Sequence, residues 1–294
     1  MTYSPPTDIA HRPVAVLGAG TLGRRIALTF ATRGGVVHLY DVSEDSLRSA
    51  REFLEQRIPE LVKARADQGA QPATIEYFTD LPSAVKNAWY VVESVPEVQA
   101  LKIDILGQLE EIAEPDAIIG TNSSSFMSSE LIGKVKHPER VLNTHYGQPP
   151  EAPQAELVTD GHTDERIFDI LSEELPKHGF VTAVARKESV GFIINRVWAA
   201  VKREALAVVA EGVSTPAEFD RIWVASGMGP VGVFRAIDRV GLDVALDIED
   251  NYIKHFPYIP AKSRDLLQRY VDEGKLGVKS GAGFYDDYPQ PSHG

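Results

Sequence analysis

The stretch Val14–Gly23, with the sequence VAVLGAGTLG, joins a short apolar run directly to three closely spaced glycines. The apolar run is typical of a buried strand, and the following residues, Arg24–Ala31, are typical of a helix. Strand, tight turn and helix start in this order form the glycine pattern that binds a dinucleotide. Gly18 allows the turn, Gly20 lets the backbone approach a pyrophosphate, and Gly23 lets the helix pack closely on the strand. The expected cofactor contacts here are Gly18, Gly20, Thr21, Leu22 and Gly23.

A second apolar run, Val36–Tyr40, ends directly on Asp41, which lies 18 residues after Gly23. A carboxylate about 20 residues beyond the glycines binds the ribose 2′-hydroxyl in such sites. No arginine immediately follows Asp41, so the 2′-phosphate of NADP would meet negative charge. We therefore predict that the chain binds NAD and that Asp41 contacts the ribose. The alternative is that Asp41 is only a turn residue or helix cap.

The composition of the 294 residues narrows the class of protein. The absence of cysteine excludes disulfides, thiolate metal sites and a cysteine nucleophile, and we expect no metal centre. A net charge of −12 argues against nucleic-acid binding. No apolar run approaches the roughly 20 residues of a membrane span, and residues 1–12 lack the apolar region of a signal peptide. We expect a cytoplasmic protein that acts on a small molecule.

Between residues 13 and about 183, short apolar segments alternate with amphipathic ones. This alternation predicts an α/β fold, a doubly wound, mostly parallel Rossmann sheet with helices on both faces. Strands are expected at 14–17, 36–40, 89–93, 117–120, 140–144 and 181–184. Helices are expected at 21–33, 43–66, 98–113, 128–134 and 163–178.

From about Gly191 the sequence pattern becomes helical, with an alanine-rich stretch that runs to Ala210. Thr215-Pro216 is typical of a helix cap followed by a proline in the first turn. No strand periodicity is visible beyond this point. We predict that a smaller, all-α C-terminal domain follows the sheet.

The change of pattern predicts two domains, an NAD-binding domain over residues 12–188 and a helical domain over 189–286. We expect the helical domain to close over the substrate, and residues 1–11 and 287–294 to be flexible. The segment 197–245 carries more apolar side chains than a single layer of helices can bury. This indicates a homodimer formed through this domain. The alternative is that the two domains bury these side chains against each other.

His145 stands at the end of a predicted strand and is followed by a Pro-Pro loop. The carboxyl ends of strands line the ligand crevice of a doubly wound sheet, and imidazole is a natural base at neutral pH. Glu156, eleven residues later, is the nearest downstream carboxylate expected on an ordered segment, and a carboxylate can fix the imidazole tautomer. His145 is thus a candidate base, the alternative being one of eight ordinary histidines.

Six blocks of the sequence form one ordered set: Gly18–Gly23, Val92–Glu97, Asn122–Ser125, the His145 loop, Gly191–Arg196 and Gly281–Tyr285. Together they resemble, over about residues 12–284, the 3-hydroxyacyl-CoA dehydrogenase family. This family includes relatives, such as lambda-crystallin, that oxidise small free hydroxy acids. The resemblance implies NAD-dependent interconversion of a 3-hydroxyacyl substrate and its 3-oxo form.

The resemblance also implies roles for single residues. His145 would be the catalytic base, with Glu156 as its orienting partner. Ser124 would lie near the substrate hydroxyl and the nicotinamide, and Asn195 would hold the substrate oxygen. From the residues alone, a structural role is favoured for both: Ser124 as a helix cap, and Asn195 as a cap or a bridge between helices.

Three further residues match cofactor contacts of this family. Glu97 and Lys102 correspond to a pair at the nicotinamide end, and Asn122 corresponds to another contact. The alternative for Lys102 is a solvated helix position paired with Glu97 or Glu93.

Two departures from the family pattern concern the substrate. Gln148 stands where an asparagine usually follows the histidine. The segment Arg51–Gln71 carries few basic residues where acyl-CoA enzymes have a longer, lysine-rich hairpin, and the phosphates of CoA need a basic cradle. The short, weakly basic segment argues against CoA as part of the substrate. We keep both an acyl-CoA and a free small 3-hydroxy acid as substrates, and slightly favour the thioester because of the family resemblance.

Two other functions remain open from the sequence. The 6-phosphogluconate and β-hydroxyacid dehydrogenases share the architecture but use a lysine in the helical domain as base, where this chain offers Asn195-Arg196. A non-catalytic, crystallin-like NAD-binding protein is the other alternative.

Overall fold

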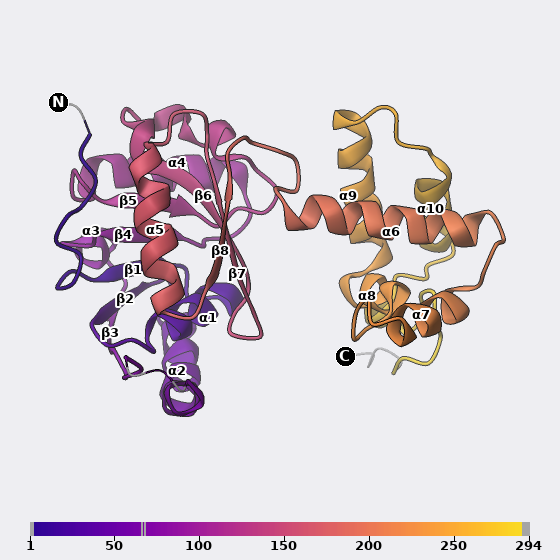
Figure 1. Ribbon diagram of the computed structural model, residues 1–294, viewed down its shortest axis with the longest axis horizontal. Helices are drawn as coiled ribbons and strands as arrows, with labels where there is room; N and C mark the ends of the chain where they lie inside the picture. Colours follow the sequence, from indigo (N-terminus) through magenta and orange to yellow (C-terminus); the bar gives the residue numbers. More distant parts are fainter. Residues whose placement is uncertain (1–2, 66, 68, 290–294) are drawn as a thin grey trace. The chain divides into compact units, whose positions relative to one another are not determined.

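The computed structural model describes residues 3–65, 67 and 69–289 as two compact units, one up to Phe192 and one from Ile193 onward (Figure 1). Of the segments expected to be flexible, residues 1–2 and 290–294 lie outside this description. Within those segments, the Tyr3 hydroxyl donates to the carbonyl of Asp116 at 3.1 Å, and Asp287 pairs with Arg235.

An eight-stranded sheet forms the centre of the first unit, with the order β3-β2-β1-β4-β5-β6-β7-β8. Neighbouring strands pair in parallel except for β6 and β7, which are antiparallel. The strands are β1 Val14–Leu17, β2 Val36–Tyr40, β3 Thr74–Phe78, β4 Tyr90–Glu93, β5 Ile118–Thr121, β6 Val141–Gln148, β7 Ala152–Val158 and β8 Val181–Ala185. The predicted doubly wound, mostly parallel sheet is confirmed, and its strand order reverses between β1 and β4, where such sheets bind nucleotides.

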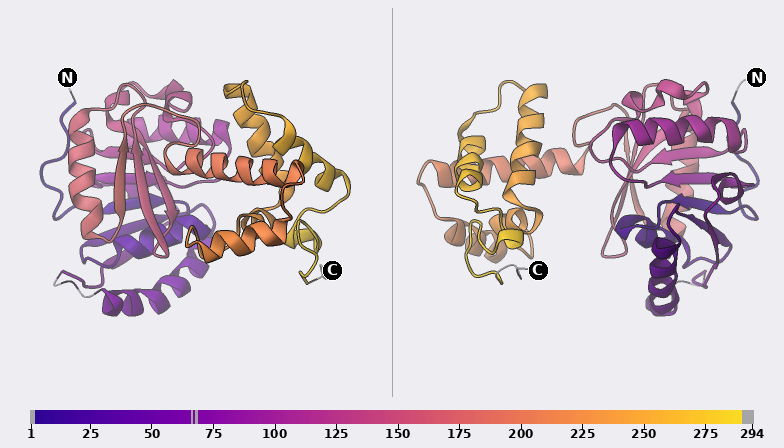
Figure 2. Two further views of the ribbon diagram at one scale, coloured as in Figure 1. Left: turned by 45° about the vertical axis from the view of Figure 1, so that its right-hand side comes forward. Right: turned by 180° about the vertical axis from the view of Figure 1, so that it is seen from behind.

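Helices cover both faces of this sheet because each has one apolar face to bury. The helices are α1 Thr21–Phe30, α2 Glu44–Ala64, α3 Leu81–Val85, α4 Gln99–Ile112 and α5 Glu165–Lys177. Side chains of α1, α2 and α5 share one buried cluster with the sheet, and those of α3 and α4 share the other. Accordingly, α5 lies in front of the sheet in Figure 1, and α4 lies in front when the molecule is seen from behind in Figure 2.

Four elements differ from the sequence-based expectation. Strands β3 and β7 and the short helix α3 were not predicted. The helix expected at 128–134 is instead a pair of 3-10 turns, Ser128–Glu130 and Ile132–Lys134. Serines and Gly133 in this segment favour turns over a continuous helix. The three residues between β6 and β7 are too few for a crossover, so β7 can pair with β6 only in antiparallel fashion.

The second unit is helical, as expected, and has its own apolar core around Phe234, Ile237 and Leu242. Its helices are α6 Ile194–Ala210, α7 Pro216–Ala225, α8 Val233–Val240, α9 Leu242–His255 and α10 Lys262–Asp272. Thr215 caps α7 ahead of Pro216, and its hydroxyl accepts from the amide of Glu218 at 3.3 Å. Among the residues described in both units, no helix is long and apolar enough to cross a membrane.

Candidate active site

The glycine turn after β1 has the backbone geometry that a dinucleotide requires. Gly18 has a φ of 101°, a conformation that favours glycine, and its amide donates to the carbonyl of Tyr40 at 2.7 Å. A Cβ on Gly23 would lie 1.8 Å from the Gly18 carbonyl oxygen, so only glycine lets α1 pack this closely on the turn. A Cβ on Gly20, by contrast, would meet no described atom within 4 Å. That open space is where a ligand can approach the backbone.

The start of α1 completes an anion site. No side chain caps this helix, and its first turn, which holds Thr21 and Leu22, contains no acidic residue. The first N–H groups of a helix lack intrahelical partners and lie at the positive end of its dipole. The turn and helix start therefore fit the pyrophosphate of NAD.

Asp41 lies at the carboxyl end of β2, beside the same turn. Its two carboxylate oxygens accept from the amides of Ala19, at 2.8 Å, and Ser43, at 2.9 Å. The cap of α2 is Ser43 rather than Asp41, because the Ser43 hydroxyl accepts from the amide of Ser46 at 3.2 Å. Asp41 therefore stabilises the turn, and it lies at the position where a carboxylate is predicted to bind the ribose.

The predicted nicotinamide contacts gather at the carboxyl ends of β4 and β5. The Glu97 carboxylate accepts from the Ser123 hydroxyl at 2.7 Å and from the amides of Ser124 and Ser125 at 3.0 and 2.8 Å. Burial raises the pKa of the Glu97 carboxyl, but the hydrogen bonds from Ser123 and Ser125 and the charge of Lys102 outweigh it, and the net shift is downward. Glu97 is therefore an ionised group that fixes the loop in which Ser124 is exposed.

Lys102 and Asn122 are both buried. Lys102 is not a solvated helix position, since 1% of its side chain is exposed and its Nζ lies 2.8 Å from Glu93 and 3.2 Å from Glu97. Asn122 accepts from the amide of Tyr146 through its Oδ1 at 2.9 Å and so ties β5 to β6. From the sequence, Glu93 was considered only as a partner of a solvated Lys102. Its burial beside Lys102 was missed, although an acidic residue that ends an apolar strand was a visible signal.

His145 and Glu156 face each other across the β6–β7 pair. They are partners in the antiparallel register, and His145 Nδ1 lies 2.7 Å from Glu156 Oε2. Both side chains are buried, and the His145 ring packs on Phe192 with 5.1 Å between ring centres. A carboxylate on Nδ1 leaves Nε2 as the nitrogen that takes a proton. The missed strand β7 is thus the element that brings Glu156 to His145.

Asn195 lies in the first turn of α6 and belongs to the second unit, whereas the other candidate residues belong to the first. Gln148, at the end of β6, is exposed. The role of Asn195 in the site therefore remains a prediction.

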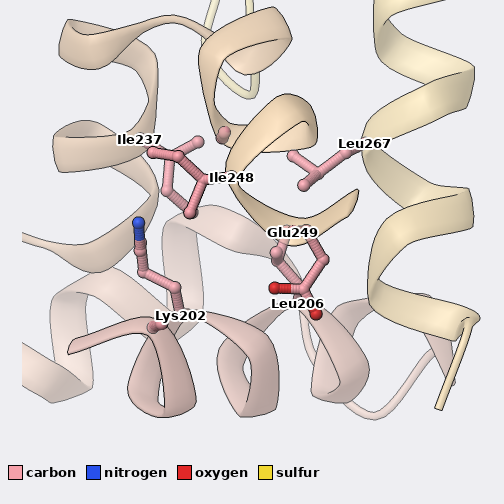
Figure 3. A pocket seen from close by; sticks show the side chains of 8 residues that line it. Lys202, Leu206, Ile237, Ile248, Glu249 and Leu267 are labelled. Atoms are coloured by element: carbon pink, nitrogen blue, oxygen red, sulfur yellow. The ribbon is translucent and has the colours of Figure 1, made fainter. Parts of the chain in front are cut away.

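Two hollows in the described residues lie away from these side chains. The first, in the helical unit, has a volume of about 10 Å³ and is lined by Lys202, Ile237 and Glu249 among others (Figure 3). It has room for about one water molecule and is too small for a substrate. The second, of about 210 Å³, includes Val14 and Val36 and therefore lies at the amino ends of β1 and β2, opposite the glycine turn. Neither is the cofactor site.

Comparisons with known proteins identify the family of the chain. Residues 13–189 match the family model described as 3-hydroxyacyl-CoA dehydrogenase, NAD binding domain, and residues 191–287 match 3-hydroxyacyl-CoA dehydrogenase, C-terminal domain. A probable 3-hydroxybutyryl-CoA dehydrogenase of Bacillus subtilis is 31% identical over 290 residues, which cover 94% of this chain and 97% of the relative. A 5-formyl-3-hydroxy-2-methylpyridine 4-carboxylate 5-dehydrogenase of Mesorhizobium japonicum is 28% identical, with 95% of this chain and 92% of the relative covered.

Solved structures give the same result. The (S)-3-hydroxybutyryl-CoA dehydrogenase of Ralstonia eutropha superposes with a TM-score of 0.84 at 26% identity, covering 96% of this chain and all of the other. A diketoreductase that acts on dicarbonyl compounds superposes with a TM-score of 0.77 at 29% identity, covering 97% of this chain and 99% of the other.

Proposed function

The chain belongs to the 3-hydroxyacyl-CoA dehydrogenase family, and from this premise we propose that it interconverts a 3-hydroxyacyl substrate and its 3-oxo form, with His145 and Glu156 as the acid–base pair. It is an NAD-dependent oxidoreductase of CH–OH groups. The observation that supports the proposed mechanism is the 2.7 Å contact between His145 Nδ1 and Glu156 Oε2, in the second half of β6.

In the proposed oxidation, His145 Nε2 takes the proton of the substrate 3-hydroxyl as the C3–H bond breaks and the C3–O bond becomes a carbonyl. NAD supplies the acceptor for the hydride that leaves C3. Glu156 stabilises the imidazolium that forms and keeps the ring oriented. Ser124 and Asn195 donate to the substrate oxygen and stabilise its developing charge.

The cofactor would be held by two groups of residues. Gly18, Gly20, Thr21, Leu22 and Gly23 would hold the pyrophosphate, and Asp41 would bind the adenosine ribose. The second group, at the carboxyl ends of β4 and β5, would line the nicotinamide end: it comprises Glu97, Lys102 and Asn122.

We leave two substrate forms within the proposal, an acyl-CoA thioester and a free small 3-hydroxy acid. The similar dehydrogenases named for 3-hydroxybutyryl-CoA support the thioester. The basic residues on α2 give CoA phosphates less support, because Arg57 contacts Glu151 at 3.3 Å and Arg65, which follows α2, contacts Asp67 at 2.8 Å. We further propose that the enzyme works as a cytoplasmic homodimer formed through the helical unit.

A substrate panel tests the reaction directly. NADH absorbance is followed with 3-hydroxybutyryl-CoA, longer 3-hydroxyacyl-CoAs and the matching free acids. Turnover of one class alone identifies the substrate form. No turnover of any 3-hydroxy compound, by a protein that still binds NAD, would overturn the proposed function.

A further inference from the structure

Glu93 is a fully buried carboxylate at the carboxyl end of β4. Its oxygens accept from the Thr121 hydroxyl at 2.6 Å, from the amide of Val95 at 2.9 Å and from Lys102 Nζ at 2.8 Å. All three partners are donors, and a carboxylate that only accepts is ionised. Glu93 therefore carries a negative charge inside the protein.

Lys102 is held on three sides. Its Nζ contacts Glu93 Oε1 at 2.8 Å, the carbonyl of Val95 at 3.2 Å and Glu97 Oε2 at 3.2 Å. An ammonium group has three N–H donors, so these contacts use all of them. In this arrangement Lys102 is a positioning residue that joins two carboxylates.

The cluster of Glu93, Lys102 and Glu97 has a formal charge of −1, from two carboxylates and one ammonium. One side chain in the cluster is fully buried and another is 1% exposed, so solvent screens this charge less than it would at the surface.

The cluster lies on one side of the point where the strand order reverses. Asp41 and the glycine turn lie at the ends of β2 and β1, whereas the cluster lies at the ends of β4 and β5. A dinucleotide spans this crevice, with one nucleotide on each side. If Asp41 binds the adenosine ribose, as proposed, the nicotinamide would occupy the half of the crevice on the side of the cluster.

We propose that Glu93 sets the preference of the site for oxidised over reduced cofactor. The nicotinamide ring of NAD⁺ carries a positive charge that is lost when the ring accepts a hydride. A cluster of charge −1 favours the charged ring, and neutralising Glu93 brings the cluster to zero. This inference rests on NAD binding and is independent of which hydroxy compound is the substrate.

The test compares the Kd values of NAD⁺ and NADH, measured separately by calorimetry, in the full chain and in Glu93→Gln. We expect the ratio of Kd for NAD⁺ to Kd for NADH to rise about three- to tenfold in the variant. This is the change expected when one charge–charge interaction at short range is lost. A ratio that stays within twofold of wild type would overturn the proposal. Failure of the wild-type chain to bind either form would instead count against the cofactor assignment.

Two control variants separate charge from structural damage. Glu110, near the other end of α4, is also a largely buried carboxylate and lies 3.3 Å from Arg140. Glu110→Gln removes the same charge on the side of the amino ends of the strands, away from the carboxyl ends where the cluster lies, and leaves the ratio unchanged. Thr121→Val removes the 2.6 Å hydrogen bond to Glu93 but keeps the charge, so it also leaves the ratio unchanged. A shift in Thr121→Val as large as in Glu93→Gln would show that geometry, not charge, is responsible.

A further variant covers the case in which Glu93→Gln does not fold. Glu97→Gln removes one negative charge from the same cluster at a side chain that is 36% exposed, where substitution disturbs packing less. We expect the ratio to rise in this variant as well, and an unchanged ratio would overturn the proposal.

Discussion

At the scale of single residues, the proposed mechanism depends on an imidazole whose orientation is fixed by the strand beside it. His145 and Glu156 share a register position, so the backbone ladder, and not side-chain flexibility, holds Nδ1 within 2.7 Å of the carboxylate. Both side chains are buried, which strengthens the interaction by lowering the local dielectric constant. If His145 is the base, as proposed, an imidazole held this way would need little reorganisation to take a proton.

Replacement of this imidazole tests its role. We expect His145→Ala to lower kcat by about 10²–10⁴-fold, the usual loss for a general base, while the Kd for NAD changes less than about threefold. NADH absorbance gives the rate, and calorimetry gives the affinity. Glu55→Gln, at an exposed position of α2, is the control and retains full activity. A rate near that of wild type in His145→Ala would remove the residue from the mechanism.

At the scale of elements, the glycine turn could be predicted almost completely, because its constraints are local. Gly18 needs a positive φ and Gly23 needs close helix packing, and both requirements are met within a few residues of sequence. Strand β7 could not be predicted in the same way, because Pro153 and Gln154 weaken its strand pattern and its pairing with β6 comes from the tertiary fold.

The nicotinamide half of the site shows the same limit. The spacing of Glu97 and Lys102 was visible, but the burial of Lys102 depends on Glu93, which comes from the adjacent strand β4. Strand β3 was missed although its alternation of exposed and half-buried residues is a strand pattern. It lies at the edge of the sheet, where its partner is β2. Contacts between residues that are far apart along the chain leave little signal in a single sequence.

The glycines of the turn make a prediction about this element. Gly20→Ala changes the free energy of unfolding by less than about 1 kcal/mol, because the new Cβ meets no described atom within 4 Å. It weakens NAD binding at least about tenfold, because the methyl group occupies the approach of the pyrophosphate. Gly23→Ala loses about 3 kcal/mol of stability, since its Cβ would lie 1.8 Å from the Gly18 carbonyl.

Thermal unfolding with and without NAD measures both effects. The expected pattern is a normal Tm without ligand and a reduced NAD-induced shift for Gly20→Ala, and a low Tm in both conditions for Gly23→Ala. Equal loss of Tm in the two variants without NAD would contradict the assignment of separate roles.

The end of α5 gives a prediction about pH. Burial lowers the pKa of His178 to about 4 from its ordinary value of 6.5, and its Nδ1 lies 2.9 Å from the carbonyl of Phe30. The unfolded chain therefore takes up a proton below pH 6.5 that the folded chain excludes until about pH 4. The stability contributed by neutral His178 is complete above pH 6.5 and is lost as the pH falls toward 4.

Urea unfolding at pH 7 and pH 5 measures this effect against His178→Gln. Wild type should lose about 2 kcal/mol more stability than the variant between these two pH values, since the other titrating groups are common to both. Equal losses in the two proteins would show that His178 does not titrate as the structure indicates.

At the scale of the whole molecule, each of the two units has its own core, and the helical one leaves apolar side chains at its surface. Ile222 and Met228, within and just after α7, are 70% and 67% exposed. Exposed apolar side chains of this size in one region are typical of an interface between subunits. They motivate the proposal that a second copy of the chain packs on the helical unit.

Sedimentation equilibrium at micromolar concentration tests this assembly. We expect a dimer of the 32.2 kDa chain, and we expect Ile222→Glu to shift the protein toward monomer, because a charge would be buried without a partner in the interface. Val181→Glu is the control, since Val181 is 63% exposed but lies on β8 in the other unit, and this variant stays dimeric. A wild-type monomer at these concentrations would contradict the proposed dimer. It would favour the alternative given by the sequence, in which the two domains bury these apolar side chains against each other.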